Sequence, residues 1–219
     1  MSERFQEALF SLEPLRPDWG FEEELSRTGY KVICGIDDAG RGPLAGPVAA
    51  ACVIFHRKLS LPGLMDSKAI SSVKRDMLFE KIISSKDISF AVGMSSVEEI
   101  DALNILNATH LAMRRALESL DVQPDALLID GNIPLRGVQC FQKTVVKGDA
   151  RCRSISAASI LAKVTRDRWM KECSALYPGY EFDVHKGYGT RKHFELLEKY
   201  GPCPLHRKSF APVRRLQSQ

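Results

Sequence analysis

Two adjacent carboxylates, Asp37 and Asp38, stand where an apolar segment gives way to a turn dense in glycine. The apolar, β-branched segments on both sides of this turn favour strands. Side chains alternate between the faces of a strand, so neighbouring aspartates diverge unless the strand ends there. Gly40 and Gly42 mark such an end, because glycine permits conformations and close approaches that a Cβ would block. Two acids at the mouth of a sheet suit a hard divalent cation, with room left for a substrate phosphate.

The turn has two other interpretations. A dinucleotide-binding loop also places glycines after a strand, but here they fall at positions 35, 40, 42 and 46, and Gly-x-Gly-x-x-Gly is not met. The segment after the turn also has the pattern of a strand rather than that of the helix such a loop requires. A tight hairpin with solvated aspartates stays open at this point, since aspartate is common in turns.

The run Gly-Ile-Asp-Asp-Ala-Gly-Arg-Gly-Pro-Leu-Ala-Gly-Pro-Val at residues 35–48 resembles the opening signature of type 2 ribonucleases H, the bacterial ribonuclease HII family. Further segments match the family in the same order: 66–68, 128–131, 146–149, 157–163, 166–167, 185–190 and 206–210. The resemblance spans roughly residues 31 to 213, and several ordered motifs are far harder to meet by chance than one. One position departs from the family, which carries glutamate where this chain has Asp38.

The resemblance implies an α/β protein with the ribonuclease H-like fold, a mixed five-stranded sheet flanked by helices, and a helical C-terminal extension. It divides the chain into an N-terminal helical segment (1–29), a catalytic domain (30–180) and a C-terminal part (181–219) that completes the substrate groove.

Hydrophobic patterns predict elements that agree with this implication. The expected strands are 30–34 leading into the acids, 47–55, 88–92, 124–130 and 138–146. The expected helices are 71–84, 97–102, 104–120, 154–176 and 191–200. In the longest of these helices, Ala157, Ala158 and Ala162 form a face of small residues that could lie close to the sheet.

Four acids are expected to meet: Asp37, Asp38, Asp130 and Asp149. Asp130 ends a continuous apolar strand, and Asp149 opens the segment that leads into the Ala-rich helix. Acids gathered in this way repel one another unless divalent cations compensate them. Carboxylates, waters and phosphate oxygens are the ligands of Mg²⁺ and Mn²⁺, so we expect one of these metals, as two ions once substrate is bound. For Asp130 and Asp149 singly, the alternative is a plain turn residue.

The family's reaction is the hydrolysis of the phosphodiester on the 5′ side of a ribonucleotide, which leaves 3′-hydroxyl and 5′-phosphate ends. The resemblance assigns Gly40, Arg41 and Gly42 to the 2′-hydroxyl, the group that separates RNA from DNA. It assigns Tyr188 to the sugar of the next nucleotide. Tyr188 lies between two glycines without apolar neighbours at regular spacing, although packing on the last helix is the alternative. The implied substrates are RNA–DNA hybrids and duplex DNA that contains ribonucleotides.

Basic charge is concentrated in the second half of the chain. Residues 143–171 hold eight lysines and arginines against two acids, whereas residues 1–30 hold three against seven. Clustered basic charge is the footprint of a polyanion. The candidates for phosphate contacts are Lys68, Lys163, Arg166 and Arg207, with solvated surface charge as the alternative for each of them. Asp167 is expected to pair with a neighbouring arginine.

Other catalytic chemistries find little support. The five histidines are scattered and no Gly-x-Ser-x-Gly elbow occurs. Cys203 and His206 have the types of zinc ligands, but nothing nearby completes a tetrahedral set. His185 and His206 flank the motifs, where they either contact substrate or order the C-terminal part.

The segment from Gln6 to Phe10 resembles the Gln-x-x-Leu-Phe peptide by which bacterial replication proteins bind the sliding clamp; the alternative is simple helix packing.

No apolar run reaches the length of a membrane span. The N-terminus Met-Ser-Glu-Arg also lacks a signal-peptide pattern, so a cytoplasmic protein is expected. We also expect a monomer. The main alternative to an enzyme is a hybrid-binding protein whose catalysis is weakened by Asp38. The sister type 3 ribonucleases H generally carry an extra N-terminal domain, for which 30 residues leave no room.

Overall fold

Five strands form the centre of the molecule in a computed structural model that describes residues 16–65 and 70–217. The strands are β1 Ile33–Ala39, β2 Val48–Phe55, β3 Ile88–Ser95, β4 Ala126–Asp130 and β5 Phe141–Val145. They lie in the order β3-β2-β1-β4-β5. The pairs β1–β2 and β2–β3 are antiparallel, whereas β1–β4 and β4–β5 are parallel. The mixed five-stranded sheet expected from the resemblance is confirmed.

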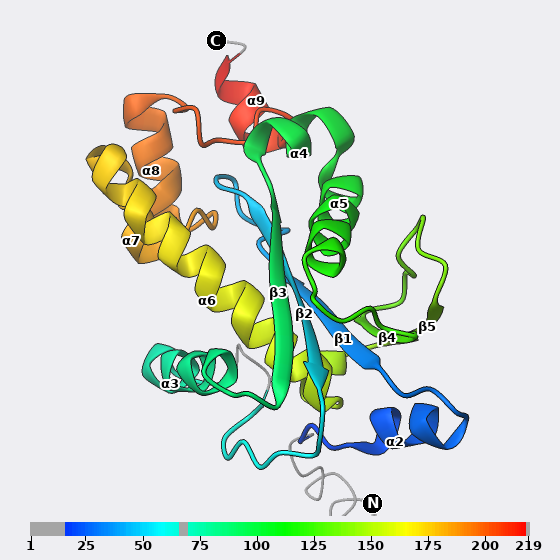
Figure 1. Ribbon diagram of the computed structural model, residues 1–219. Coiled ribbons are helices and arrows are strands. Elements are labelled where there is room, and N and C mark those ends of the chain that lie inside the picture. Colours follow the sequence, from blue (N-terminus) through cyan, green and yellow to red (C-terminus); the bar gives the residue numbers. More distant parts are fainter. Residues whose placement is uncertain (1–15, 66–69, 218–219) are drawn as a thin grey trace, which may run out of the picture.

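Helices follow the strands and cover the sheet (Figure 1). They are α2 Gly20–Arg27, α3 Ser72–Ile83, α4 Val97–Leu103, α5 Ile105–Glu118, α6 Arg153–Leu176, α7 Phe182–His185, α8 Arg191–Tyr200 and α9 Ala211–Gln217, with 3-10 turns η1 Gly148–Ala150 and η2 Pro178–Tyr180. The five helices expected from periodicity are confirmed. The short helices α7 and α9 were not predicted individually, because one or two turns carry too little periodicity to recognise. Among the helices of the described chain, none is long and apolar enough to cross a bilayer.

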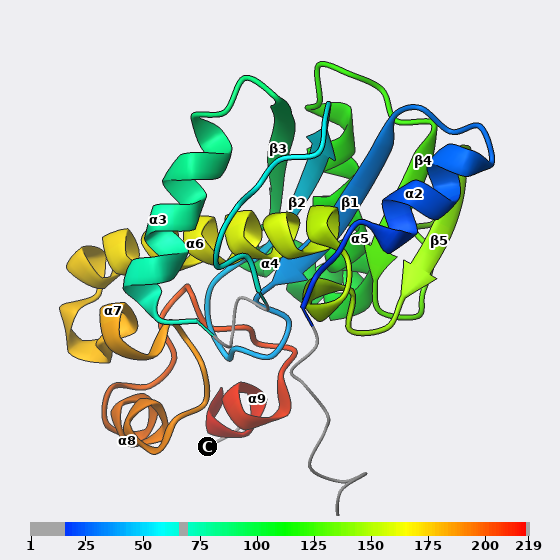
Figure 2. The same cartoon turned by 90° about the horizontal axis from the view of Figure 1, so that it is seen from below.

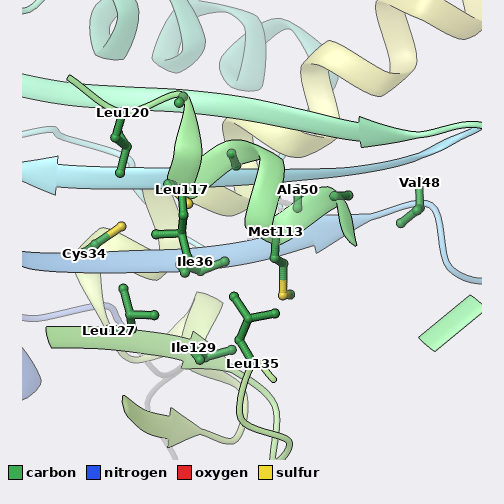
Figure 3. Packing of buried hydrophobic residues seen from close by; sticks show 14 of the residues in the cluster. Cys34, Ile36, Val48, Ala50, Met113, Leu117, Leu120, Leu127, Ile129 and Leu135 are labelled. Atoms are coloured by element: carbon green, nitrogen blue, oxygen red, sulfur yellow. The ribbon is translucent and has the colours of Figure 1, made fainter. Parts of the chain in front are cut away.

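The sheet is buried on both faces because its central strands carry apolar side chains on both sides. On one face, Cys34 and Ile36 of β1 and Leu127 and Ile129 of β4 pack against α5 (Figure 3). On the other face, residues of β2 pack against α3 and α6. The small residues Ala157, Ala158 and Ala162 of α6 are fully buried in this second cluster, as the sequence predicted.

Helix α6 crosses β1 at very close range, and its position matters because it supplies side chains to the site described below. A Cβ on Gly35 would lie 2.3 Å from the backbone carbon of Ser154, so only glycine fits at this crossing. Glu22 of α2 fixes the beginning of the same helix. Its Oε1 accepts hydrogen bonds from the amide and the hydroxyl of Ser154, both at 2.9 Å, and a carboxylate is favourable at a helix N-terminus.

The C-terminal helices α7, α8 and α9 gather beyond the C-terminal half of α6 (Figure 2). Main-chain hydrogen bonds join this region to the loop between β1 and β2. Leu44 donates to the carbonyl of Gly187 at 2.8 Å, and Arg207 donates to the carbonyl of Leu44 at 2.9 Å. The C-terminal part is thus fixed to the loop that follows the two aspartates. The predicted division of the chain at residue 180 stays a prediction.

Candidate active site

A cavity of about 560 Å³ opens at the ends of β1 and β4, which run parallel and therefore finish at the same edge of the sheet. The residues that line it are Asp37, Asp38, Ala39, Gly40, Arg41, Gly42, Asp130, Ser159, Lys163 and Tyr188. Eight of the twelve residues assigned to the site from sequence are in this set. The solvated hairpin weighed earlier is excluded, because Asp37 is only 5% exposed.

Asp37 is the buried centre of this cavity. Its position on β1 faces α6, where the Ser159 hydroxyl donates a hydrogen bond to the carboxylate. The backbone amide of Asp38 donates to Asp37 Oδ1 at 2.7 Å. Burial raises the pKa of Asp37 well above its ordinary value, and the nearby carboxylates of Asp130 and Asp38 raise it further. The hydrogen bonds oppose this rise but do not cancel it, so the three acids repel one another in the absence of a cation.

Asp130 is the last residue of β4, and the turn after β5 holds its side chain. The amide of Gly148 donates to Asp130 Oδ1 at 2.7 Å. Asp149 follows in η1 and is 7% exposed. It is not among the residues that line the cavity. The structure therefore brings Asp37, Asp38 and Asp130 together and places Asp149 in the turn that orients Asp130.

The three cavity carboxylates suit an incompletely enclosed divalent cation. Within the described ranges, no group of three or more His, Cys, Asp or Glu side chains is arranged so that it could hold a metal ion by itself, so waters and substrate would have to supply ligands. Mg²⁺ is usually bound in this way, with one or two carboxylates and the remaining positions taken by waters and substrate phosphate. The repulsion that raises the pKa of Asp37 is the feature that a bound cation would relieve.

The loop Gly40–Pro47 is shaped by two buried arginines. Arg207 donates to the carbonyls of Gly40, Arg41, Pro43, Gly46 and Pro47 at 2.6–3.1 Å. Arg166 donates to the carbonyls of Ala45, Pro47 and Lys186 at 2.9–3.0 Å. Both side chains are fully buried. The prediction that Arg166 and Arg207 contact substrate phosphates is therefore wrong, because their guanidinium groups are occupied by main-chain carbonyls and do not reach the surface.

Lys163 and Tyr188 lie on the cavity wall, and their contact with substrate stays a prediction. The Lys163 ammonium is 5.2 Å from the centre of the Tyr188 ring, and Arg166 Cζ is 5.6 Å from it. Lys163 also bonds Asp167 Oδ1 at 2.8 Å, and Arg75 lies 3.9 Å from the same carboxylate. Asp167 thus pairs with a lysine as well as an arginine. Tyr188 is 39% exposed, so one face of its ring is available to a ligand.

Ser159 was not predicted as a site residue. It lies one helical turn before Lys163 on α6, and the spacing of four could have placed both side chains on one face. His185 and His206 do not line the cavity but are buried in the C-terminal part. The predicted phosphate contact Lys68 and the segment from Gln6 to Phe10 lie outside the described residues.

The chain is similar to characterised nucleases. The sequence profile of the family described as ribonuclease HII matches residues 34–213. A ribonuclease HII from Caldicellulosiruptor bescii is 52% identical over 190 residues, which cover 86% of this chain and 91% of that protein.

Solved structures show the same likeness at lower identity. Ribonuclease H2 from Pyrococcus horikoshii OT3 superposes with a TM-score of 0.71 and 28% identity, covering 85% of this chain and 97% of the other. RNase HII from Archaeoglobus fulgidus, solved in a complex with PCNA, gives a TM-score of 0.68 and 25% identity, covering 80% of this chain and 93% of the other.

Proposed function

The chain belongs to the ribonuclease HII family, and on this premise we propose how its residues perform the family's reaction. It is a type 2 ribonuclease H, a metal-dependent endonuclease that acts on RNA–DNA hybrids. The alternative of a binding protein with weakened catalysis is not favoured by this membership.

In this proposal Asp37, Asp38 and Asp130 hold Mg²⁺ or Mn²⁺, and Asp149 acts with them from the adjoining turn. When bound, these ions, which we expect to number two, activate a water and stabilise the charge on the leaving oxygen. Neighbouring residues of the chain orient the carboxylates that would hold these ions. Ser159 and the Asp38 amide hold the Asp37 carboxylate, and Gly148 holds that of Asp130.

Recognition of the substrate is assigned to the rest of the cavity wall. Gly40, Arg41 and Gly42 would read the 2′-hydroxyl through main-chain groups, since a Cβ on Gly42 would meet no atom within 4 Å and its backbone is open to a ligand. Lys163 would contact a phosphate, which fixes register without reading sequence. Tyr188 would stack on the deoxyribose that follows. This set of roles suits single ribonucleotides in duplex DNA as well as long hybrids, with cleavage on the 5′ side. We also expect a monomer in the cytoplasm, where its DNA substrate is found.

The proposal depends on one observation, which is that the Asp37 carboxylate is buried beside the carboxylates of Asp130 and Asp38. A bound cation would stabilise these neighbouring negative charges. The test is a duplex with one ribonucleotide, incubated with Mg²⁺, Mn²⁺ or EDTA, with the cut mapped to the nucleotide. Asp130→Asn should lose at least about 10³-fold in rate, as for groups that stabilise developing charge. Asp121→Asn, the same change in an exposed loop, is the matched control. Activity in EDTA, or full activity of Asp130→Asn, would refute the proposal.

Binding to a sliding clamp is a separate part of the proposal. The solved relative from Archaeoglobus fulgidus is in complex with PCNA, and the segment Gln6 to Phe10 has the type of a clamp-binding peptide. We expect Leu9→Ala with Phe10→Ala to abolish capture of the chain by immobilised bacterial clamp, while cleavage of a short duplex is unchanged. Equal capture of the double variant and the wild type would show that this segment does not bind the clamp.

A further inference from the structure

Three buried histidines meet in the C-terminal part of the fold. His185 belongs to α7, His193 to α8, and His206 to the loop before α9, and their exposed fractions are 7%, 0% and 0%. The rings of His185 and His193 are stacked with centroids 4.1 Å apart, and those of His193 and His206 are 5.2 Å apart. Phe182 packs edge-on or tilted against all three. None of these histidines lines the catalytic cavity.

Their hydrogen bonds determine where the protons are. His206 Nδ1 lies 3.0 Å from the amide nitrogen of Cys203 and 3.3 Å from the Cys203 carbonyl oxygen. We assign the shorter contact as the hydrogen bond, donated by the amide, so that this nitrogen carries no proton. His206 Nε2 then carries the proton and donates to His193 Nε2 at 3.0 Å. His193 Nε2 is therefore the acceptor, and His193 Nδ1 donates to the carbonyl of Tyr188 at 2.9 Å. The result is a directed chain of hydrogen bonds from Cys203 to the backbone of Tyr188.

His185 holds the other side of the same backbone. The amide of Gly187 donates to His185 Nδ1 at 3.1 Å, and His185 Nε2 donates to the carbonyl of Tyr180 at 2.6 Å. Imidazoles thus fix both the amide of Gly187 and the carbonyl of Tyr188. Burial lowers the pKa of His193 to about 4 and, with the charge of His193, that of His206 to about 4. Both rings are therefore neutral at neutral pH. The hydrogen-bond chain requires this, because only one of the two facing Nε2 atoms can carry a proton without repulsion between them.

The segment that contains His206 also holds the loop assigned to the ribonucleotide. The next residue, Arg207, donates to the carbonyls of Gly40 and Arg41, and Ala45 forms a β-bridge with His206. Two neighbouring residues therefore contact the two recognition elements: Arg207 contacts the glycine loop, and His206 contacts Tyr188 through His193.

We propose that His193 and His206 are positioning residues that set the Tyr188 ring relative to the Gly40–Gly42 loop, and so determine preference for an RNA-to-DNA junction. The inference rests on the proposed role of Tyr188 as the reader of the following deoxyribose. Neither histidine contacts substrate. They act by fixing the carbonyl of Tyr188 together with the amide of Thr190, which donates to the same oxygen at 2.8 Å. The Tyr188 ring itself lies beside Lys163 and Arg166.

The experiment compares two substitutions of one residue. In His193→Asn, the amide nitrogen takes the place of Nδ1 and keeps the donor to Tyr188. In His193→Gln, the longer amide takes the place of Nε2, keeps a partner for His206, and removes the imidazole donor from the Tyr188 carbonyl, which keeps the bond from the amide of Thr190 at 2.8 Å. The readout is the ratio of kcat/KM on a duplex with one ribonucleotide to kcat/KM on a uniform RNA–DNA hybrid. His193→Gln should lower this ratio by about two- to tenfold, the equivalent of one hydrogen bond. His193→Asn should stay within about twofold of wild type, because it keeps that bond.

Controls separate this inference from its premise. In Tyr188→Ala the ratio should fall, and adding His193→Gln to Tyr188→Ala should lower it no further. A fall with Tyr188→Ala but not with His193→Gln would overturn the positioning role alone. No fall with Tyr188→Ala would overturn the assigned role of Tyr188 and the inference with it. Equal losses on both substrates in His193→Gln, with a lowered Tm, would assign the histidines to stability only. If His193→Gln does not fold, His193→Met, which also lacks a donor for the Tyr188 carbonyl, replaces it with the same expected fall.

Discussion

Arg207 Nη2 donates a hydrogen bond to the carbonyl oxygen of Gly40 at 2.6 Å, across 167 residues of sequence. The guanidinium is fully buried, and burial, followed by the nearby charge of Arg166, lowers the pKa of Arg207. Five carbonyl oxygens of one loop stabilise the buried cation in return. A positive charge that cannot reach a phosphate is therefore used to shape the loop that we propose to read the ribose.

Arg207→Lys tests this function of the buried cation. A lysine ammonium has three donors on a flexible stem and cannot replace five bonds from a planar group. We expect the free energy of unfolding to fall by about 2 kcal/mol or more and cleavage to fall by about 10²-fold, because a loop displaced by about 1 Å misplaces the substrate. Urea denaturation and single-turnover cleavage provide the measurements. Lys208→Ala, an exposed neighbour, should change stability by less than about 0.5 kcal/mol. A wild-type rate for Arg207→Lys would contradict the assignment.

The arginines also mark the limit of what local sequence predicts. The strands and acids were recognised because their signal is contained in a few residues: apolar runs that end in Asp37 or Asp130. The burial of Arg166 and Arg207 depends on a loop more than a hundred residues away in sequence, and nothing near either arginine indicates it. Residue type suggested a phosphate contact, whereas the tertiary fold supplies carbonyls instead.

Asp149 shows the same limit in a different way. Its motif, Val-Lys-Gly-Asp at residues 146–149, placed it with the other acids. The structure separates the two roles that this segment contains: Gly148 bonds Asp130, and Asp149 stays out of the cavity wall. Spacing along the chain indicated which turn meets β4, and the grouping of the Asp149 carboxylate with the other three acids stays a prediction.

Asp37 makes the stability of the metal-free enzyme depend on pH. Its pKa is raised by burial first and by Asp130 and Asp38 next. Between the ordinary carboxyl pKa of about 3.9 and the raised value, the folded state binds more protons than the unfolded state. The free energy of unfolding therefore falls as pH rises through this window. In Asp37→Asn this fall should be weaker, so in EDTA the variant should be more stable than wild type at pH 7 and lose that advantage toward pH 4.

The measurement is Tm against pH in EDTA and in Mg²⁺. Each kcal/mol gained should raise Tm by about 2–4 °C for a chain of this size. Mg²⁺ should stabilise the wild type more than Asp37→Asn, since the cation removes the repulsion that the substitution has already removed. Parallel Tm profiles for the two proteins would show that burial and repulsion at the Asp37 carboxylate do not lower the free energy of unfolding.

Gly35 tests the close crossing of β1 and α6. A Cβ at this position would lie 2.3 Å from Ser154 C and 2.4 Å from Ile155 N, and both are main-chain atoms that cannot turn away. We expect Gly35→Ala to lower the free energy of unfolding by about 3 kcal/mol, at the upper end of overpacking costs. Gly42→Ala, whose Cβ would meet no atom within 4 Å, should keep the wild-type Tm. Similar melting of the two variants would mean that α6 can shift away from the strand.

Asp38→Glu addresses the departure from the family signature. Asp38 lies on the cavity wall beside Asp37 and Asp130, and glutamate would carry its carboxylate about 1.5 Å further from the backbone. A catalytic group displaced by about 1 Å can lose on the order of 10²-fold in rate. We therefore expect Asp38→Glu to raise single-turnover cleavage of a duplex with one ribonucleotide by up to about 10²-fold, with the Kd for that duplex changed by less than about twofold. Asp38→Asn, which keeps the length but removes the charge, should be slower than wild type, so the pair separates carboxylate reach from charge. A rate for Asp38→Glu equal to or below wild type would show that the surrounding residues, Ser159 and the Gly40 loop among them, have adapted to the shorter acid.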